Sequence, residues 1–344
     1  MSRYIIRRLL QAIPLLFFVS IILFFLMGEM GDPVATMGGR RVTRPADRER
    51  LTRQLGLDQP MYRQYLYWLI GNDWEQIDVD GDGVGDTAGT RRGILRGDFG
   101  NSLMKRGQSA WEVIWDRIPN TLLLMVTAEI VIVVFALLIG IFSALRQYTL
   151  ADHIITGVSF IGFSTPIFFF ALLSIYIFSV NFKRWGLPSL PAVGMFDPQV
   201  GKTPGQVALH MILPVMTIAF VSIAAYSRYI RSTMLEVMNQ DYIRTARAKG
   251  LRGRQVLFVH ALKNASLPIV TLIGLDLALL LGGALVTERI FAWPGMGRLF
   301  LDHMQRFDVP VVMGILIILS VTVVVFQIIT DLTYALLDPR IRYD

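Results

Sequence analysis

Six long apolar stretches dominate the pattern of hydrophobic and polar positions along the chain. They cover residues 9–27, 121–145, 154–180, 207–225, 265–286 and 311–337. A helix of roughly 20 apolar residues is long enough to cross the hydrocarbon core of a bilayer. The pattern therefore predicts an all-α integral membrane protein with six transmembrane helices. The polar residues between the first and second stretches predict a large external insert.

Composition agrees with a membrane protein and excludes other classes. Of 344 residues, 53% are hydrophobic and 17% are charged, whereas soluble domains average about 25% charged residues. The absence of cysteine excludes a disulfide-stapled secreted domain and any thiolate metal site. The first stretch follows three arginines, as in a signal peptide, but no small-residue cleavage site follows Met27. We therefore expect it to be retained as an anchor.

Lysine and arginine in the loops predict the orientation, because cytoplasmic loops are enriched in them. Arginines precede the first stretch, and a second basic group lies between the fourth and fifth: Arg228, Arg231, Arg244, Arg247, Lys249, Arg252, Arg254 and Lys263. With six spans, both groups fall on one side. Both termini are thus expected in the cytoplasm, with residues 29–119 outside. The net charge of +7 is then explained by basic residues that set the topology and face membrane lipid. No nucleic-acid partner is expected.

Few ionisable or helix-breaking residues lie within the apolar stretches. Glu129 is in the second and Asp276 in the fifth, Asp331 is near the inner end of the sixth, and Pro166 interrupts the third. Acids inside a membrane line a substrate or ion path, or they pair across helices in a structural role. Both interpretations stay open. As a hypothesis, we assign Glu129, Pro166 and Asp276 to a translocation path.

The external segment contains an acidic run with the spacing of a calcium loop. Counted from Asp78 as position 1, the carboxylates at positions 1, 3, 5 and 9 belong to Asp78, Asp80, Asp82 and Asp86. Position 6 is a glycine, Gly83. Oxygen ligands have this spacing in EF-hand loops, but position 12, normally a bidentate glutamate, is a glycine here. The four aspartates are candidate ligands for weakly bound Ca²⁺. The alternative is a solvated acidic turn.

The segment between the fourth and fifth stretches is expected to form two short helices. Residues 236–250 are good helix formers that end in a glycine, a typical C-terminal cap, and a second helical run covers residues 254–264. Two short helices around a glycine break favour a docking knob for a partner protein. The alternative is a basic hairpin that contacts only anionic lipid.

The most specific motifs are DYIRTARAKGL at 241–251 and HALKNASLP at 260–268. Further motifs follow along nearly the whole chain outside residues 72–92: LGLDQP at 55–60, GDFGNS at 97–102, PNTL at 119–122, FSTPIF at 163–168, ERIFAWPGMGR at 288–298 and LLDPRIRY at 336–343. Together they resemble permease subunits of binding-protein-dependent ABC importers. More narrowly, they resemble the dipeptide, oligopeptide and nickel branch, and the first of its two paired permeases.

This resemblance implies that a helix near residues 241–250 sits in a groove of a separate ATPase and couples ATP hydrolysis to the spans. The residues assigned to coupling are Asp241, Tyr242, Arg244, Thr245, Ala246, Arg247, Lys249, Gly250 and Leu251. Ala246 and Gly250 would allow close approach of the ATPase, and the basic residues would pair with its acidic rim. The wider family begins this signature with Glu-Ala-Ala. Arg244 stands at the glutamate position and does not inherit its role.

The resemblance also implies the partners and the division of the chain. The partners are a second permease, two ATP-binding subunits, an external solute-binding protein and membrane lipid, in a bacterial or archaeal inner membrane. Residues 1–28 form the N-terminus and first span. Residues 29–119 form the external segment, with an Asp-rich insert at 72–92. Residues 120–344 form the transmembrane core, with the coupling loop at 230–264.

The chain itself is expected to be a transport subunit without an ATPase site, forming half of a path for peptides or related small solutes. ATP and Mg²⁺ would bind the partner subunits, and this chain would hold no cofactor except possible Ca²⁺ in the Asp-rich loop. Gly201-Lys202-Thr203 ends like a phosphate-binding loop, but Phe196 stands where its first glycine is required. The alternative is a stand-alone secondary transporter or channel, which predicts an inverted repeat. Residues 1–170 and 171–344 show no such repeat.

Overall fold

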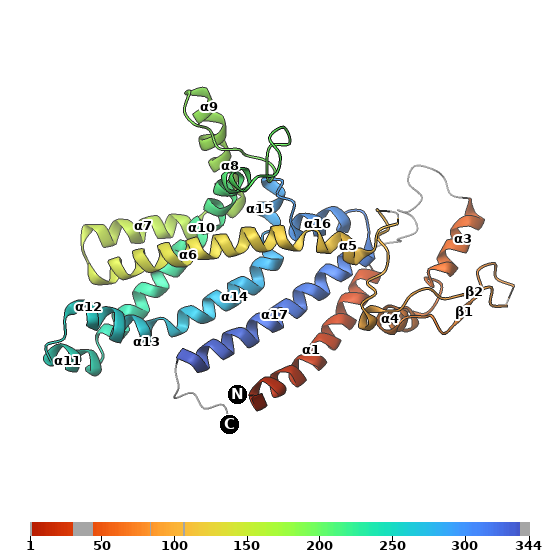
Figure 1. The fold of residues 1–344 in the computed structure, drawn as a ribbon, viewed down its shortest axis with the longest axis horizontal. Coiled ribbons are helices and arrows are strands. Elements are labelled where there is room, and N and C mark those ends of the chain that lie inside the picture. The colour runs from red at the N-terminus through yellow and green to blue at the C-terminus, as the bar shows by residue number, and fades with distance from the viewer. Residues whose placement is uncertain (1, 30–43, 83, 106, 338–344) are drawn as a thin grey trace. The chain divides into compact units, whose positions relative to one another are not determined.

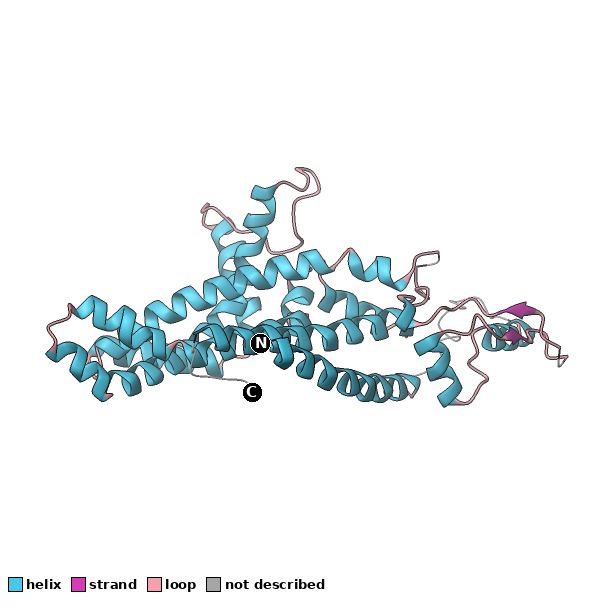
Figure 2. Ribbon diagram, turned by 60° about the horizontal axis from the view of Figure 1, so that its bottom comes forward, coloured by secondary structure: helices cyan, strands magenta, loops and turns pink. Residues whose placement is uncertain are grey.

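The computed structural model describes residues 2–29, 44–82, 84–105 and 107–337. Side chains are described for these residues except 2–5, 267–268, 278–283 and 334–337. Gly83 of the acidic run and residues 338–343 of the C-terminal motif lie outside the described residues. Helices make up most of the described chain (Figures 1 and 2). Its strands β1 (Gln76–Ile77) and β2 (Thr87–Ala88) form one short antiparallel pair.

Five described helices are long and apolar enough to cross a membrane. They are Ile6–Gly28, Ala110–Leu145, Ile167–Arg184, Pro204–Met238 and Val309–Thr333. A sixth span results if Gly253–Ala265 and Ile269–Leu277, which meet at a bend of 50°, are counted together. These helices confirm the expected all-α membrane class.

The predicted third span, residues 154–180, is broken at Pro166, the residue that interrupts this stretch in the sequence. Helix α7 (Leu150–Ser164) ends before Pro166, and α8 (Ile167–Ser174) begins after it. Proline disfavours helical geometry in the residue before it, and Thr165 is extended, with φ −83° and ψ 122°. The span therefore begins at Ile167 and continues through the π-helix η2 (Ile175–Asn181) and α9 (Phe182–Arg184).

The described chain divides into two compact units. The first, the core unit, comprises Asn120–Arg298 and Thr322–Asp344, and the second, the insert unit, comprises Ser2–Pro119 and Leu299–Val321. One boundary lies between residues 119 and 120, and residues 299–321 group with the N-terminal segment. The division into an N-terminus with the first span, an external segment and a transmembrane core stays a prediction.

The core unit is built from helices. In addition to α7, α8, η2 and α9, it holds α6 (Ile118–Leu145), α10 (Pro204–Met238), α11 (Asp241–Ala248), α12 (Gly253–Gln255), the π-helix η3 (Val256–Leu262), α13 (Lys263–Ala265), α14 (Leu267–Gly283) and α15 (Leu285–Ile290). Its largest apolar cluster joins α6 to α10 through residues such as Leu124, Ile132 and Ile230. A side chain at Gly140 would collide with Ile230, so this glycine allows the close approach of the two helices.

A buried carboxylate ties three helices of the core unit together. Asp152, near the start of α7, accepts hydrogen bonds from Ser143 at the end of α6 and from the backbone N–H of Tyr148. The guanidinium of Arg231 on α10 donates to both of its oxygens, from Nε at 2.9 Å and from Nη2 at 2.7 Å. A bidentate pair of this kind fixes the position of α7 against α10.

The insert unit combines α1 with the polar segment between α1 and α6. Its elements are α1 (Ser2–Gly28), α3 (Pro45–Gln54), α4 (Met61–Ile70), β1, β2, the 3₁₀-helix η1 (Ile94–Arg96), α5 (Ala110–Trp115), and parts of α16 (Met296–Met304) and α17 (Val309–Leu337). Phe24 and Met27 of α1 pack with Trp68 of α4 and Met313 of α17. Ser20 and Tyr65 add a hydrogen bond of 2.8 Å between α1 and α4.

Candidate functional site

Helix α11 is the expected docking helix, and both of its ends are locally determined. Asp241 lies in the first turn and Arg247 in the last, where each charge complements the helix dipole. At the C-terminal end, the N–H of Gly250 donates to the carbonyl of Arg247, and the N–H of Leu251 donates to that of Ala246. This pair of bonds is a Schellman motif, which requires the left-handed φ of +74° that Gly250 adopts.

One face of α11 is buried within the chain itself. Ile243 is 0% exposed and Ala246 is 6% exposed, and both belong to the main apolar cluster of the core unit. The structure therefore corrects the expectation that Ala246 offers the ATPase a close approach. Sequence spacing placed Ala246 on a shared helical face but did not reveal that this face packs against the π-helix η3.

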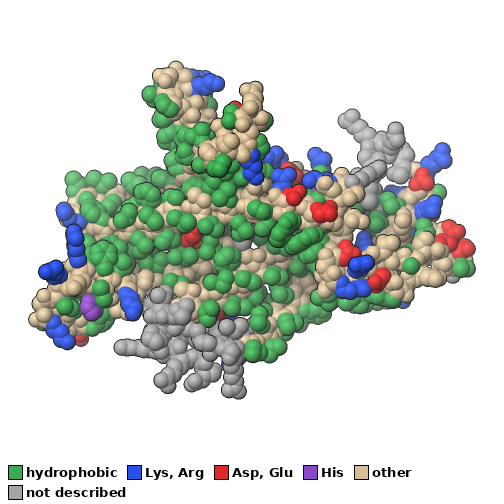
Figure 3. Space-filling view, in the orientation of Figure 1, with side chains coloured by type: hydrophobic (Ala, Val, Ile, Leu, Met, Phe, Trp, Pro, Cys, Tyr) green, Lys and Arg blue, Asp and Glu red, His purple; other side chains and the backbone are tan. Residues whose placement is uncertain are grey.

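The opposite face of α11 and the residues after it are exposed and basic. The exposed members are Asp241, Tyr242, Arg244, Thr245, Arg247, Lys249, Gly250, Leu251, Arg252 and Arg254. Figure 3 shows lysine and arginine side chains gathered at the part of the core unit that carries α11 and α12. Arg244 pairs with Asp241 of the same helix at 3.6 Å, and both side chains are exposed to solvent. We call this surface the α11 face.

The α11 face is held by the helices beside it. The second predicted helix, residues 254–264, is confirmed as the continuous run of α12, η3 and α13. Asn264 at its end donates a hydrogen bond to the Tyr242 hydroxyl of α11 at 3.2 Å. Both α10 and α11 pack against η3. Helix α11 is therefore connected through η3 to α10, a helix of 35 residues that is long and apolar enough to span a membrane.

Within the spans, the structure brings together two of the three residues assigned to a path. Glu129 of α6 and Asp276 of α14 lie close enough to interact, and both interact with Tyr226 of α10. Sequence reasoning missed Tyr226, because its hydroxyl does not stand out in an apolar helix. Pro166 instead marks the break before α8. Asp331 is buried near the C-terminal end of α17, beside Gln327.

The acidic run of the insert unit folds into the tip between β1 and β2. Carboxylate oxygens of Asp78, Asp80 and Asp86 all lie within 4.8 Å of one another. Asp82 is not part of this group, and its carboxylate accepts from the N–H of Val84 at 2.7 Å. One oxygen of Asp86 also accepts the N–H groups of residues 79 and 80. Three of the four predicted ligands therefore converge.

Two buried acids that sequence reasoning left without a role have structural ones. Glu288, at 0% exposure, accepts hydrogen bonds from the Thr121 hydroxyl at 2.9 Å and the Arg298 N–H at 3.0 Å. Gly295 leaves room for this carboxylate, since a side chain there would overlap it. The ERIFAWPGMGR motif is thus folded around its own glutamate. The glutamate at the start of this motif was the feature of the sequence from which its structural role could have been suspected.

The second buried acid, Asp308, organises the insert unit. Its carboxylate accepts from the Ser102 hydroxyl at 2.6 Å and from His303 Nδ1 at 2.8 Å. Burial raises the pKa of Asp308, but the hydrogen bonds from His303, Ser102 and two backbone N–H groups outweigh it and hold the pKa below its ordinary value. This tie therefore stabilises the unit at neutral pH and weakens only in acid. The Ser102 hydroxyl donates its hydrogen bond to Asp308 and not to His303. In a catalytic triad the histidine must accept the proton of the serine, so these three residues do not form one.

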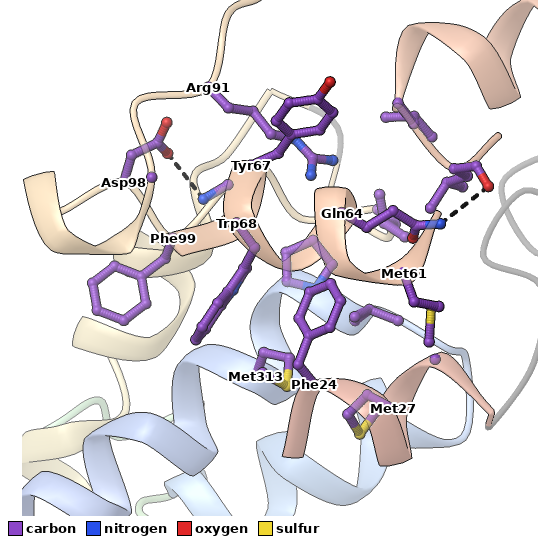
Figure 4. Close-up of a pocket in the computed structure, with 18 of the residues that line it drawn as sticks. Phe24, Met27, Met61, Gln64, Tyr67, Trp68, Arg91, Asp98, Phe99 and Met313 are labelled. Atoms are coloured by element: carbon purple, nitrogen blue, oxygen red, sulfur yellow. Dashed lines mark hydrogen bonds between the residues drawn. The ribbon is translucent and has the colours of Figure 1, made fainter. Parts of the chain in front are cut away.

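The insert unit also contains a partly open, mainly apolar cavity of about 460 Å³. Figure 4 shows Phe24, Met27 and Met313 at one side of this cavity, with Tyr67, Arg91 and Asp98 at the other. The hydroxyl of Tyr67 donates to Glu75 at 2.6 Å, and Asp98 accepts from the N–H of residue 92 at 2.8 Å. The Tyr67 hydroxyl and the Asp98 carboxylate at the rim of the cavity therefore already have hydrogen-bond partners within the insert unit.

Comparison with known proteins covers the whole chain. The family described as "Binding-protein-dependent transport system inner membrane component" matches residues 136–343, and its N-terminal companion, "Binding-prot-dependent transport system membrane comp, N-term", matches residues 1–125. The oligopeptide transport system permease protein AppB of Bacillus subtilis is 41% identical over 348 residues, covering 100% of both chains.

Two further relatives are similar over their full length. The dipeptide transport system permease protein DppB of Escherichia coli is 36% identical over 363 residues, covering 100% of this chain and 99% of its own. The di/tripeptide transport system permease protein DppB of Pseudomonas aeruginosa is 36% identical over 362 residues with the same coverage. These matches, with the apolar spans and the coupling motif, agree with the resemblance seen in the sequence. The chain belongs to the inner membrane components of binding-protein-dependent transport systems, as a permease subunit of an ABC importer.

Proposed function

We propose that this permease imports peptides as one of two paired membrane subunits, and that its α11 face is the docking site for an ATPase subunit. Relatives named as oligopeptide, dipeptide and di/tripeptide permeases support the solute class. The partners would be a second permease, two ATP-binding subunits and an external solute-binding protein. Both termini and α11 would lie in the cytoplasm. A stand-alone transporter is not favoured, because the family works with a binding protein.

The α11 face is the observation that carries the docking proposal. One side of α11 is anchored in the core unit through Ile243 and Ala246, while the other presents exposed arginines and a lysine. A surface helix needs no such row of charges for its own stability, since exposed ion pairs contribute little. A small element that is anchored on one side and charged on the other is suited to transmit a rigid-body movement between subunits.

Charge reversal on the α11 face tests the docking. In cells that express the complete importer, we expect Arg244→Glu with Arg247→Glu to abolish co-purification of the ATPase subunits and ATP-dependent uptake. The matched control reverses two basic residues at the far end of the third span, Lys183→Glu with Arg184→Glu. This control should keep the ATPase bound. Equal ATPase recovery from both variants would contradict docking at α11.

The solute class needs a separate measurement. Proteoliposomes that contain the purified complex and its binding protein should accumulate radiolabelled tri-alanine only when ATP is inside together with Mg²⁺. Uptake without the ATPase subunits would contradict the proposed division of labour. Uptake of other small solutes with no uptake of peptides would contradict the proposed solute.

A further inference from the structure

Three polar side chains from three helices meet inside the membrane-spanning part of the core unit. Glu129 lies on α6, Tyr226 on α10 and Asp276 on α14. The Tyr226 hydroxyl faces both carboxyl groups, and the two carboxyl groups also interact with each other. Charged side chains are otherwise sparse on the apolar surface of these helices (Figure 3). We call this group the acidic triad.

The acidic triad is buried without the partners that buried polar groups normally have. Glu129 is 5% exposed and Tyr226 is 4% exposed. Neither carboxyl oxygen of Glu129 nor the Tyr226 hydroxyl forms a hydrogen bond of ordinary geometry with any residue that the structure describes. Asp276 is half-buried.

No basic side chain in the described part of the chain forms an ion pair with the triad's acids. The arginine closest in sequence to Tyr226 on α10 is used elsewhere. The guanidinium of Arg228 stacks over the rings of Phe160 and Phe163, at 5.0 and 4.8 Å from their centres. The triad is therefore a concentration of acceptor oxygens that lacks a cation.

Such an arrangement is unfavourable while the carboxyl groups are charged and no cation pairs with them. An unpaired buried polar group loses its hydration without compensation, at a cost of about 1–3 kcal/mol or more. Two neighbouring carboxylates in a low-dielectric interior also repel each other. Intramembrane acids are retained where they serve a substrate or ion path. A cation placed among the three oxygen-bearing groups would relieve both penalties.

The geometry of the triad selects one class of cation. A primary ammonium group has three N–H donors, and the triad holds oxygens on three side chains from three helices. A divalent metal ion takes about six or more oxygen ligands, which is more than these three side chains offer. An ammonium group is also the cationic end of a peptide.

We propose that the acidic triad binds the protonated amino group of the peptide as it passes along the core unit. This inference rests on the peptide transport proposed above and adds where the cationic end of the solute is held. Glu129 and Asp276 supply the negative charge, and the Tyr226 hydroxyl contributes an acceptor. The triad lies on three different helices, so a rearrangement of the spans changes its geometry and releases the ligand.

Uptake by the complete importer in proteoliposomes provides the first test, with tri-alanine as the probe. We expect Glu129→Gln with Asp276→Asn to lower ATP-dependent uptake at least tenfold, and Glu129→Asp with Asp276→Glu to stay within about threefold of the unchanged protein. Binding-protein-stimulated ATP hydrolysis should change less than twofold in both, because the α11 face is untouched. Asp116→Asn, an exposed carboxylate in the insert unit, is the control.

The outcomes separate this site from the function on which it rests. Absence of tri-alanine uptake by the unchanged complex overturns the proposed solute and the triad with it. Uptake by the unchanged complex together with normal uptake by the neutral variant overturns the triad alone. Equal loss in the neutral and the charge-retaining variants assigns these residues to packing and also overturns it.

A second measurement on the unchanged complex keeps the proposal testable if the neutral variant does not assemble. Dicyclohexylcarbodiimide should modify Glu129, detected by mass spectrometry, and ethylammonium chloride should protect it at least fivefold. Tetramethylammonium, which has no N–H donor, should not protect it. Protection by Na⁺ or Ca²⁺ but not by ethylammonium would overturn the ammonium assignment in favour of a metal ion.

Discussion

Ala246 and Ala248 show how one residue's environment decides the role of its position on α11. The two alanines are two residues apart, yet Ala246 is buried in the core unit and Ala248 is exposed. A carboxylate at position 246 would lose its hydration without a cation to pair with, a penalty of several kcal/mol. We expect Ala246→Asp to reduce the amount of folded chain in the membrane strongly and Ala248→Asp to leave it nearly unchanged.

Immunoblots of the membrane fraction and the thermal unfolding of the detergent-solubilised chain measure this difference. If Ala246→Asp accumulates and unfolds like the unchanged chain, the inner face of α11 is not packed as described. Loss of ATPase binding by Ala248→Asp with normal folding would agree with an exposed docking face.

Gly250 is required for its backbone conformation and not for the space around it. No atom outside its neighbours lies within 4 Å of the position that a side chain would take. Its φ of +74° costs an alanine roughly 1–2 kcal/mol. We expect Gly250→Ala to loosen the end of α11 and to lower ATP-dependent uptake several-fold. The matched variant is Gly253→Ala, where the site is equally open and φ is not left-handed.

Uptake normalised to the amount of assembled complex tests this prediction. Equal uptake by the Gly250 and Gly253 variants would show that the Schellman turn does not matter for coupling.

At the scale of elements, the acidic tip between β1 and β2 is a candidate Ca²⁺ site that can be tested. Three of its aspartates converge, but the loop lacks the bidentate glutamate of a complete EF-hand. We predict weak Ca²⁺ binding, with a Kd of about 10⁻⁴–10⁻³ M, as in extracellular calcium modules. Calorimetry on the purified chain should detect this binding and lose it in Asp80→Asn with Asp86→Asn.

Asp82→Asn is the control for the calcium measurement, because Asp82 lies outside the converging group and serves its own turn. Its substitution should weaken binding much less than the double change. No heat at millimolar Ca²⁺, or equal loss in both variants, would identify the tip as a solvated acidic turn.

At the scale of the whole molecule, the positions of the basic residues predict the orientation of the chain in the membrane. The chain contains no cysteine, so single cysteines can be introduced without first removing others. Gln199 and Arg252 are both exposed, the first in the loop before α10 and the second after α11. We expect a membrane-impermeant maleimide to label Gln199→Cys in intact cells and Arg252→Cys only after permeabilisation. The reverse pattern would contradict the predicted orientation.

The elements of this chain could be predicted where a local pattern is sufficient. Apolar stretches long enough to cross a bilayer predicted most of the spans, because the bilayer imposes a length that side-chain packing cannot alter. The glycine after 249 predicted the end of α11, since only a left-handed residue closes that turn. The start of the third span was placed too early, because the apolar stretch continues on both sides of Pro166 although the helix breaks there.

The sequence by itself determined the membrane class, the approximate spans and the family, because these depend on composition, length and motifs. Only the tertiary structure decided which residues meet. Glu129 and Asp276 are 147 residues apart in sequence and come together with Tyr226 through the packing of three helices. Ala246 faces inward because η3, a later segment, covers it. Contacts between distant segments depend on how helices pack, and periodicity within one helix does not specify its neighbour.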